Sequence, residues 1–306
     1  MAILLILSFG TVSLDSIQTH TESRTEVIGG SALYFAAAAS RLLPVHVIGA
    51  IGSDFPLDRL QPLAERGVDL DGLRLCSGSS LRWSARYDAT GDHRQTLSSD
   101  RTILAGYDPI LSVRELTCTS LFVGSTNPTL QRRVVGQLPA RGHEARPFVV
   151  VDSMTHWIEE EPDEVWAVAA ESDLFLANDE EIRALTNETD LREAAGALLE
   201  VGPSLVVIKH GSLGASAFES TGRTSCPALE IATVDPTGAG DAFAGGFVAS
   251  WLTHRGEGDR LRHALAAGVV CGGQATREFS FDALLKPPGD WAEEAHASLL
   301  PRMTTN

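Results

Sequence analysis

The sequence predicts an α/β domain of three layers, with helices on both faces of a mainly parallel central sheet. Short apolar runs of strand length alternate along the chain with longer segments that carry apolar residues at helical spacing. The short runs are apolar throughout, which is typical of strands buried on both faces. The chain has 306 residues and no repeat or linker that would divide it, so we expect one domain spanning residues 1–306.

The expected core elements follow one another in the order that such a fold needs. The strands are Ile3–Ser8, Val45–Ile51, Leu121–Gly124, Phe148–Val151, Leu174–Ala177 and Leu205–Ile208. The helices are Ser31–Leu43, Asp179–Leu185, Leu191–Leu199, Asp241–Leu252 and Leu261–Val270. The first apolar run is too short to cross a membrane and lacks the flanks of a signal peptide, so we expect a buried strand there.

Two segments, residues 14–28 and 81–104, have a different pattern. Both alternate polar and apolar residues and are rich in Ser and Thr, which is typical of strands with one face in solvent. Together they predict a small second β-sheet outside the main domain. This sheet would be either a lid over a ligand site or a pair of edge hairpins without a function.

The composition excludes some classes of partner. The chain has 24 Lys and Arg against 40 Asp and Glu, a net charge of −16. Such a surface disfavours binding to nucleic acid or to an anionic membrane, but a nucleotide needs only a local pocket. The four cysteines are far apart and show no metal-binding spacing (Cys76, Cys118, Cys226, Cys271). We therefore expect a reduced, cytoplasmic protein.

The most informative segment is Asp235–Phe243, which reads as a strand end, a glycine turn and a helix start. Glycine permits backbone angles closed to other residues, and little side chain blocks the amides of Gly238, Ala239 and Gly240. These N–H groups can converge on an anion, and the positive end of the following helix would add to the attraction. The turn therefore predicts an anion hole that suits a transferring phosphoryl group.

Asp241 follows this turn directly. A carboxylate there is poorly placed to bind phosphate but well placed to accept a proton from an attacking hydroxyl group. The alternative is a purely structural role as the N-cap of the helix, for which Asp is a favoured residue.

Taken as a whole, Asp235–Phe243 resembles the second signature of the ribokinase-like (PfkB) carbohydrate kinase family. The resemblance implies a three-layer α/β/α ribokinase-like fold with a small β lid. It assigns Asp241 as the catalytic base and the backbone of Gly238, Ala239 and Gly240 as the anion hole.

Further motifs resemble this family in the same order along the chain. On the acceptor side, the resemblance implies that Asp15 of Gly10–Asp15 binds substrate and that Gly29 and Gly30 form the lid hinge beside it. Gly49–Asp54 is similar to a glycine motif after the next core strand. On the nucleotide side, the implied residues are Asn178 and Glu181 for phosphate and Mg²⁺, Lys209, Gly211 and Gly214 along the phosphates, and Gly268 within the adenine segment Ala264–Ala275. Alone, each motif is also explained by a turn or a helix cap.

One position departs from the family pattern. Sugar-binding members carry Asn four residues after the second glycine of the di-glycine, whereas this chain has Tyr34. The departure puts ribose, fructose and a plain nucleoside sugar in doubt as acceptors. Tyr34 would either stack on the acceptor or pack in the core.

Several other residues are candidates for ligand contact. Asp152 and His156 follow a core strand, where ligands bind in open α/β folds, although His156 is equally explained as a loop residue. Trp83, Arg82 and Arg86 lie on the expected lid. Asp235 and Thr237 would line a site for a monovalent cation such as K⁺, as in some relatives.

These observations predict an ATP- and Mg²⁺-dependent kinase that phosphorylates a hydroxyl of a sugar, a nucleoside or a cyclitol. The expected protein is a monomer or a homodimer. One alternative is a nucleoside kinase of the same fold, and another is a sensor that binds these ligands without turnover. A dinucleotide-dependent enzyme is disfavoured, because Gly10–Asp15 does not match the G-x-G-x-x-G fingerprint.

Overall fold

The computed structural model describes residues 4–88, 91, 93–286 and 289–306. Its main sheet has the strand order β14-β13-β12-β11-β10-β9-β8-β1-β4-β5. The strands from β11 to β5 are parallel, and β12, β13 and β14 extend the sheet in antiparallel fashion. The bounds are β1 (Ile6–Phe9), β4 (Val45–Ile51), β5 (Val68–Leu75), β8 (Ser120–Val123), β9 (Phe148–Asp152), β10 (Leu174–Asn178), β11 (Leu205–Lys209), β12 (Gly214–Glu219), β13 (Gly222–Pro227) and β14 (Thr304–Thr305).

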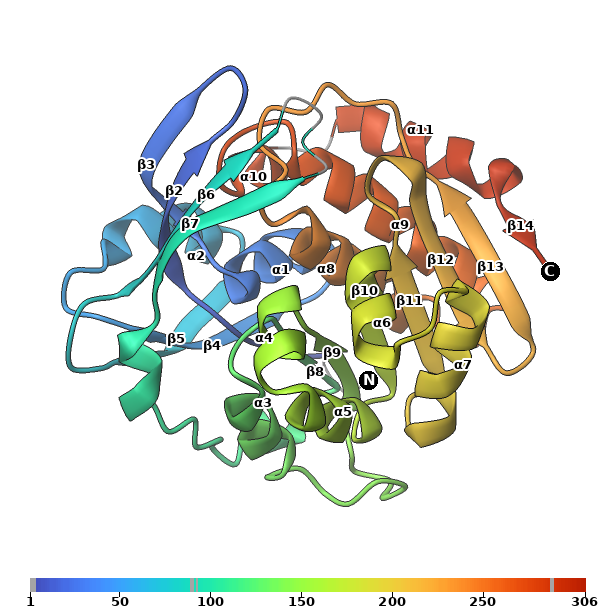
Figure 1. The fold of residues 1–306 in the computed structure, drawn as a ribbon, viewed down its shortest axis with the longest axis horizontal. Coiled ribbons are helices and arrows are strands. Elements are labelled where there is room, and N and C mark those ends of the chain that lie inside the picture. The colour runs from blue at the N-terminus through green and yellow to red at the C-terminus, as the bar shows by residue number, and fades with distance from the viewer. Residues whose placement is uncertain (1–3, 89–90, 92, 287–288) are drawn as a thin grey trace.

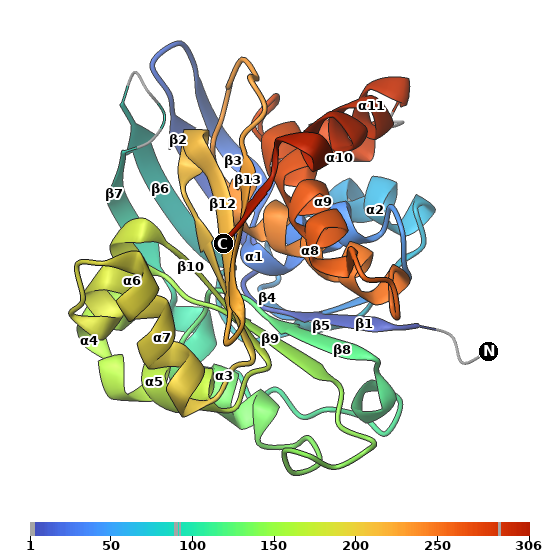
Figure 2. The same cartoon turned by 90° about the vertical axis from the view of Figure 1, so that its right-hand side faces the viewer.

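Helices cover both faces of this sheet, as Figure 2 shows. One face packs against α1 (Ser31–Ala39), α2 (Gln61–Glu65), α8 (Ala239–Thr253), α9 (Arg260–Ala275), α10 (Asp282–Leu285) and α11 (Gly289–Leu299). The other face packs against α3 (Pro128–Val135), α4 (Thr155–Glu160), α5 (Pro162–Ala170), α6 (Asp179–Thr186) and α7 (Leu191–Val201). Along β11 the buried residues alternate between these two cores, with Val207 on one side and Val206 and Ile208 on the other.

The three-layer fold with a mainly parallel sheet is therefore confirmed. The strand over Val45–Ile51 has the predicted bounds. The helix expected over Ser31–Leu43 ends at Ala39, and the helix expected from Asp241 already begins at Ala239. None of the helices in the described ranges is long and apolar enough to cross a lipid bilayer.

A second, four-stranded sheet stands apart from the main sheet, in the order β3-β2-β6-β7 (Figure 1). Its strands are β2 (Ser13–Gln18), β3 (Ser23–Gly29), β6 (Leu81–Tyr87) and β7 (Arg94–Asp100). This is the predicted small lid sheet. Its pairing is mixed, because β2 and β6 are parallel and the other pairs are antiparallel.

The predicted glycine motif Gly49–Asp54 joins the lid to the main sheet. Asp54 accepts hydrogen bonds from the backbone N–H of Ser80 at 2.7 Å and from its hydroxyl at 2.8 Å, and it pairs with Arg82 at 2.7 Å. Burial raises the Asp54 pKa, but the hydrogen bonds from Ser80 and Arg82 together outweigh it and lower the pKa to about 2. This carboxylate thus fixes the start of lid strand β6.

Candidate active site

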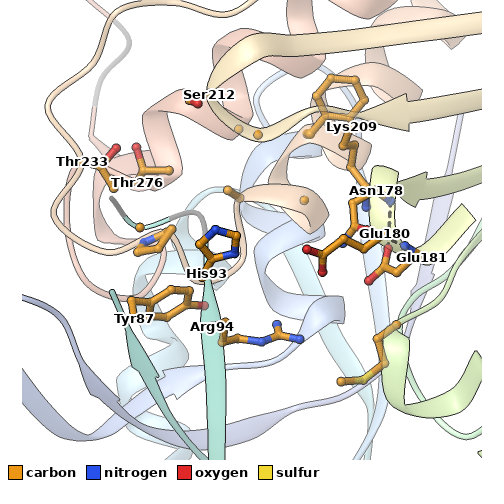
Figure 3. A pocket seen from close by; sticks show the side chains of 18 of the residues that line it. Tyr87, His93, Arg94, Asn178, Glu180, Glu181, Lys209, Ser212, Thr233 and Thr276 are labelled. Atoms are coloured by element: carbon orange, nitrogen blue, oxygen red, sulfur yellow. Dashed lines mark hydrogen bonds between the residues drawn. The ribbon is translucent and has the colours of Figure 1, made fainter. Parts of the chain in front are cut away.

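Two cavities adjoin at the edge of the main sheet where the parallel strands β10 and β11 end. The large cavity has a volume of about 720 Å³ and extends between these strand ends, the lid and helices α8 and α9 (Figure 3). The small cavity has a volume of about 120 Å³ and lies between the lid, the start of α1 and the start of α8. Arg94, Arg101 and Met154 line both cavities. A ligand in one cavity could therefore reach a ligand in the other.

The glycine turn lies between the two cavities. Gly238 and Asp241 line the small cavity, whereas Ala239 and Gly240 line the large one. Gly238 is the N-cap of α8 and has a left-handed backbone with φ 75°. A Cβ atom on Gly238 would lie 2.3 Å from ring atoms of Tyr34, so no side chain fits there.

The first amides of α8 point out of the helix, because the first turn has no intrahelical acceptors. The Ala239 N–H donates to the Pro236 carbonyl at 3.3 Å, which is a long hydrogen bond. Thr237 is tied to the lid, since its hydroxyl donates to the Tyr87 hydroxyl at 3.1 Å. The lid thus contributes to holding the turn in place.

Asp241 is the third residue of α8, and its side chain does not cap the helix. Burial raises the pKa of its carboxyl to about 7; the nearby Asp152 adds to this effect and Lys209 opposes it. No residue in the described ranges forms a hydrogen bond with this carboxyl group. A carboxyl with a pKa near neutrality, open to a cavity, is suited to act as a general base.

Lys209, at the end of β11, lies under the turn. Its Nζ is 2.6 Å from Oδ2 of Asp152 and 3.1 Å from where a Cβ of Gly240 would lie. Burial alone would lower the Lys209 pKa, but Asp152 and Glu181 raise it above its ordinary value. Lys209 is therefore a fixed positive charge beside the large cavity.

Asn178 and Glu181 form the capping box at the start of α6. The Glu181 N–H donates to Oδ1 of Asn178 at 2.8 Å, and the Asn178 N–H donates to Oε2 of Glu181 at 2.9 Å. Both residues also line the large cavity together with Glu180, and Figure 3 shows these side chains on the same side of it as Lys209. The structural and the ligand-facing interpretations of this motif are thus compatible.

Asp15 is the buried acid of the small cavity. The residue is 3% exposed, and its Oδ1 has no hydrogen-bond partner among the described residues. Burial raises the Asp15 pKa to about 7. A Cβ on Gly29 would lie 1.9 Å from Oδ2 of Asp15, whereas Gly30 lines the cavity itself with φ 105°. The di-glycine therefore makes room for this carboxyl group.

The other predicted residues occupy a range of positions. Gly211, Gly214 and His156 line the large cavity, and Thr237 lines the small one. Asp152 lines neither cavity and is buried against Lys209.

Tyr34 and Gly268 take part in packing. Tyr34 is 2% exposed and packs edge-on against Phe281, yet it also lines the small cavity. Gly268 packs against the ring of Phe243, which itself lines the large cavity.

Of the three candidates on lid strand β6, Trp83 lines the small cavity, whereas Arg82 and Arg86 line neither cavity. Arg82 pairs with Asp54, and Arg86 donates to Gln18 at 3.0 Å. The cavity-facing residues of this strand are those that alternate with them, Trp83 and Tyr87. The alternation along Leu81–Tyr87 predicts this orientation, because the apolar residues of the strand share one face.

The arginines that do reach the cavities, Arg94 and Arg101, were not predicted. Arg94 is the first residue of β7 and Arg101 directly follows its last; β7 is an edge strand whose residues are all exposed. A strand that is exposed on both faces gives no hydrophobic alternation from which its orientation could be read.

The arrangement of two cavities that meet at a glycine turn, with a cavity-facing carboxyl beside it, is that of a phosphotransferase with an alcohol acceptor. The model of the pfkB family of carbohydrate kinases matches residues 5–285, and the chain belongs to this family. It is an ATP-dependent kinase of sugars or nucleosides.

The chain is similar to kinases of both acceptor types. It is 27% identical to a cytidine kinase of Thermococcus kodakarensis over 94% of this chain and 98% of that protein. It is 31% identical to an ATP-dependent ribose-1-phosphate kinase of Halopiger xanaduensis over 84% of each. Among solved structures, the fold is similar to that of a protein of Escherichia coli described as a ribokinase II, in complex with ATP and Mg²⁺. The TM-score is 0.71 at 19% identity, and the match covers 96% of this chain and 98% of that chain.

Proposed function

We propose that this kinase uses Asp241 as the general base that activates a hydroxyl of a sugar or sugar-like acceptor bound in the small cavity. The observation that carries the proposal is the division of the turn between the cavities: Asp241 lines the small one and Gly240, its neighbour, the large one. A phosphate group over Gly240 and a hydroxyl beside Asp241 would thus be adjacent. This adjacency is what in-line transfer needs.

Phosphoryl transfer replaces one oxygen on the γ-phosphorus by another. The acceptor oxygen forms a bond to the γ-phosphorus of ATP while the bond from that phosphorus to the β–γ bridging oxygen breaks. ADP takes the electron pair of the broken bond, and the hydroxyl proton passes to Asp241. The products are ADP and the phosphorylated acceptor, with one proton released when Asp241 ionises again.

The charge of the transferring phosphoryl group is met by the turn and by Lys209. The backbone amides of Gly238, Ala239 and Gly240 form the proposed anion hole, with the positive end of α8 behind them. Lys209 adds a full charge, which Asp152 keeps in position at 2.6 Å. Both features are fixed before ATP binds, so little reorganisation accompanies the reaction.

The large cavity would hold MgATP. Gly211 and Gly214 follow β11 beside the phosphate region, and Val269, Gly272 and Gly273 on α9 provide a surface of small and apolar residues for the base. Mg²⁺ prefers oxygen ligands and keeps several waters, which fits the carboxylate of Glu181 next to Asn178. When bound, it would neutralise charge on the β- and γ-phosphates.

A monovalent cation such as K⁺ would fit beside the turn. Oδ2 of Asp235 is buried and has no hydrogen-bond partner among the residues that the structure describes. Its other oxygen, Oδ1, accepts from the Thr237 N–H at 2.9 Å. A cation there would compensate the buried carboxylate and stabilise the turn.

The test is acceptor-dependent release of ADP from MgATP, measured across sugars, nucleosides and cyclitols. At least one acceptor should raise ADP release well above the rate without acceptor, and EDTA should abolish it. Binding of both ligands with no turnover on any acceptor would instead support the sensor alternative. Replacing Na⁺ by K⁺ in the same assay tests the cation site.

A further inference from the structure

Two arginines at the junction of the cavities have no carboxylate within ion-pair distance among the residues that the structure describes. In the described part of the chain, neither Arg94 nor Arg101 forms an ion pair with a carboxylate, although the protein has 40 Asp and Glu residues. By contrast, Arg82 on the same lid sheet lies 2.7 Å from Asp54. The two guanidinium groups therefore remain available to an anion that arrives with a ligand.

Aromatic rings hold both guanidinium groups from one side. Arg94 lies over the ring of Trp83 at 5.2 Å from its centroid, and Arg101 lies over the ring of Trp157 at 5.2 Å. A stacked guanidinium keeps its N–H donors directed outward in its own plane, which suits two-pronged binding of phosphate or carboxylate. Figure 3 shows Arg94 extending from the lid strand into the large cavity.

Arg101 is also partly removed from solvent. Burial lowers its pKa, so the charged form is less stable there than in water. A desolvated cation without an anion is unfavourable for the free protein. This unfavourable feature is reversed when a ligand supplies the missing negative charge.

In the proposed arrangement, the phosphates of ATP would have their own partners in the large cavity. Lys209, Gly211 and Gly240 line only the large cavity, whereas both arginines also line the small cavity that holds Asp15 and Asp241. Ser13, Ser99 and Thr11 add hydroxyl groups to the small cavity. It thus combines acids and hydroxyls, which suit the alcohols of a sugar, with two cations, which a neutral sugar does not need.

We infer that the acceptor carries an anionic group, a phosphate or a carboxylate on a small sugar, and that Arg94 and Arg101 bind this group. The inference rests on the proposed function. Because Arg94 is on β7, binding of the anionic group would also draw the lid onto the acceptor and close the site before transfer. The two arginines are then specificity-determining residues.

The experiment compares charged and neutral acceptors in pairs. D-ribose 1-phosphate and D-ribose form the phosphate pair, 2-dehydro-3-deoxygluconate represents the sugar acids, and cytidine represents a neutral nucleoside. An anionic acceptor should have a kcat/KM about 100-fold above that of the neutral acceptors. Arg94→Gln and Arg101→Gln should each reduce this preference by about 10- to 100-fold, mainly by raising KM for the anionic acceptor.

Arg86→Gln is the matched control, because Arg86 lies on the same lid but its side chain binds Gln18. It should keep the preference of the wild type, and thermal unfolding checks that all three variants fold. Titration of D-ribose 1-phosphate or 2-dehydro-3-deoxygluconate into the ADP complex should show weaker binding in the two test variants.

Two results would overturn the inference while leaving the proposed function intact. One is higher kcat/KM with neutral acceptors than with both anionic ones. The other is an equal loss for charged and neutral acceptors in the variants, which would mean that the arginines act on the transferring phosphoryl group. Absence of turnover with every acceptor would instead remove the proposed function, and the inference with it.

Discussion

Nζ of Lys209 lies 2.6 Å from Oδ2 of Asp152, and this buried ion pair stands directly beneath the glycine turn. The two residues end β11 and β9, the strands on either side of β10. Asp152 lines neither cavity, so its contribution to the site is to hold the lysine. Removing either partner should therefore affect both stability and phosphate binding.

Asp152→Asn is expected to destabilise the protein and to weaken ATP binding. Breaking a buried pair costs about 3–5 kcal/mol in general, and we expect less here because Glu181 still stabilises the lysine charge. Denaturant unfolding and the Kd for ATP measure the two effects. The double variant with Lys209→Met should recover stability without recovering ATP affinity; simple addition of the two losses would contradict this coupling.

Gly238→Ala should disrupt the turn. The left-handed φ of 75° costs Ala about 1–2 kcal/mol, and its methyl group would overlap the Tyr34 ring. We expect lower stability and a loss of kcat that exceeds the effect on ATP binding. Gly196→Ala in α7 is the control, because its methyl group meets nothing within 4 Å and Ala favours a helix by about 1 kcal/mol. If Gly238→Ala and Gly196→Ala had the same effect on stability and on kcat, the turn would not require glycine at position 238.

The pH dependence of kcat/KM should show an acid limb. Burial raises the pKa values of Asp15 and Asp241 to about 7. Asp241 must be ionised to take the acceptor proton, and we expect an ionised Asp15 to accept a hydrogen bond from an acceptor hydroxyl in the small cavity. Below pH 7 the rate constant should fall by more than tenfold per unit when both groups titrate. In Asp15→Asn only Asp241 titrates, so the residual kcat/KM should fall about tenfold per pH unit. A flat profile between pH 5.5 and 8 in folded protein would contradict the assignment.

The free energy of unfolding should depend on pH because Asp15 is buried. Its folded pKa of about 7 lies above the value near 3.9 of an unfolded chain, so the penalty is absent below about pH 4 and complete above pH 7. Asp15→Asn should thus be more stable than the wild type at pH 8, by on the order of 3 kcal/mol, and equal to it near pH 4. Denaturant unfolding at both pH values tests the sign.

Much of the fold could be predicted because its core strands are apolar throughout. The run Val45–Ile51 is buried along its whole length, and the predicted bounds of this strand are those in the structure. In contrast, β5 and β13 alternate polar and buried residues and have no such signal, and both were missed. Such strands are stabilised by pairing with a neighbour that the local sequence does not reveal.

For the site, the sequence indicated residues on fixed backbone motifs but not those placed by tertiary packing. Asn178, Glu181 and Gly238 lie in local turns and caps whose geometry depends on a few consecutive residues. Arg94 and Arg101 reach the cavities only because the lid sheet folds over the main domain, a relation between segments distant in sequence. The sequence around Arg94 and Arg101 therefore does not predict that their side chains reach the cavities.

The central claim is that Asp241 removes the acceptor proton, and the most direct measurement is single-turnover phosphoryl transfer by Asp241→Asn beside the wild type. Asn keeps the size of the side chain but cannot accept the proton. The account predicts a fall of at least about 10³-fold in the transfer rate with the Kd for ATP changed less than threefold. Transfer at the wild-type rate by a folded, ATP-binding Asp241→Asn variant would contradict it.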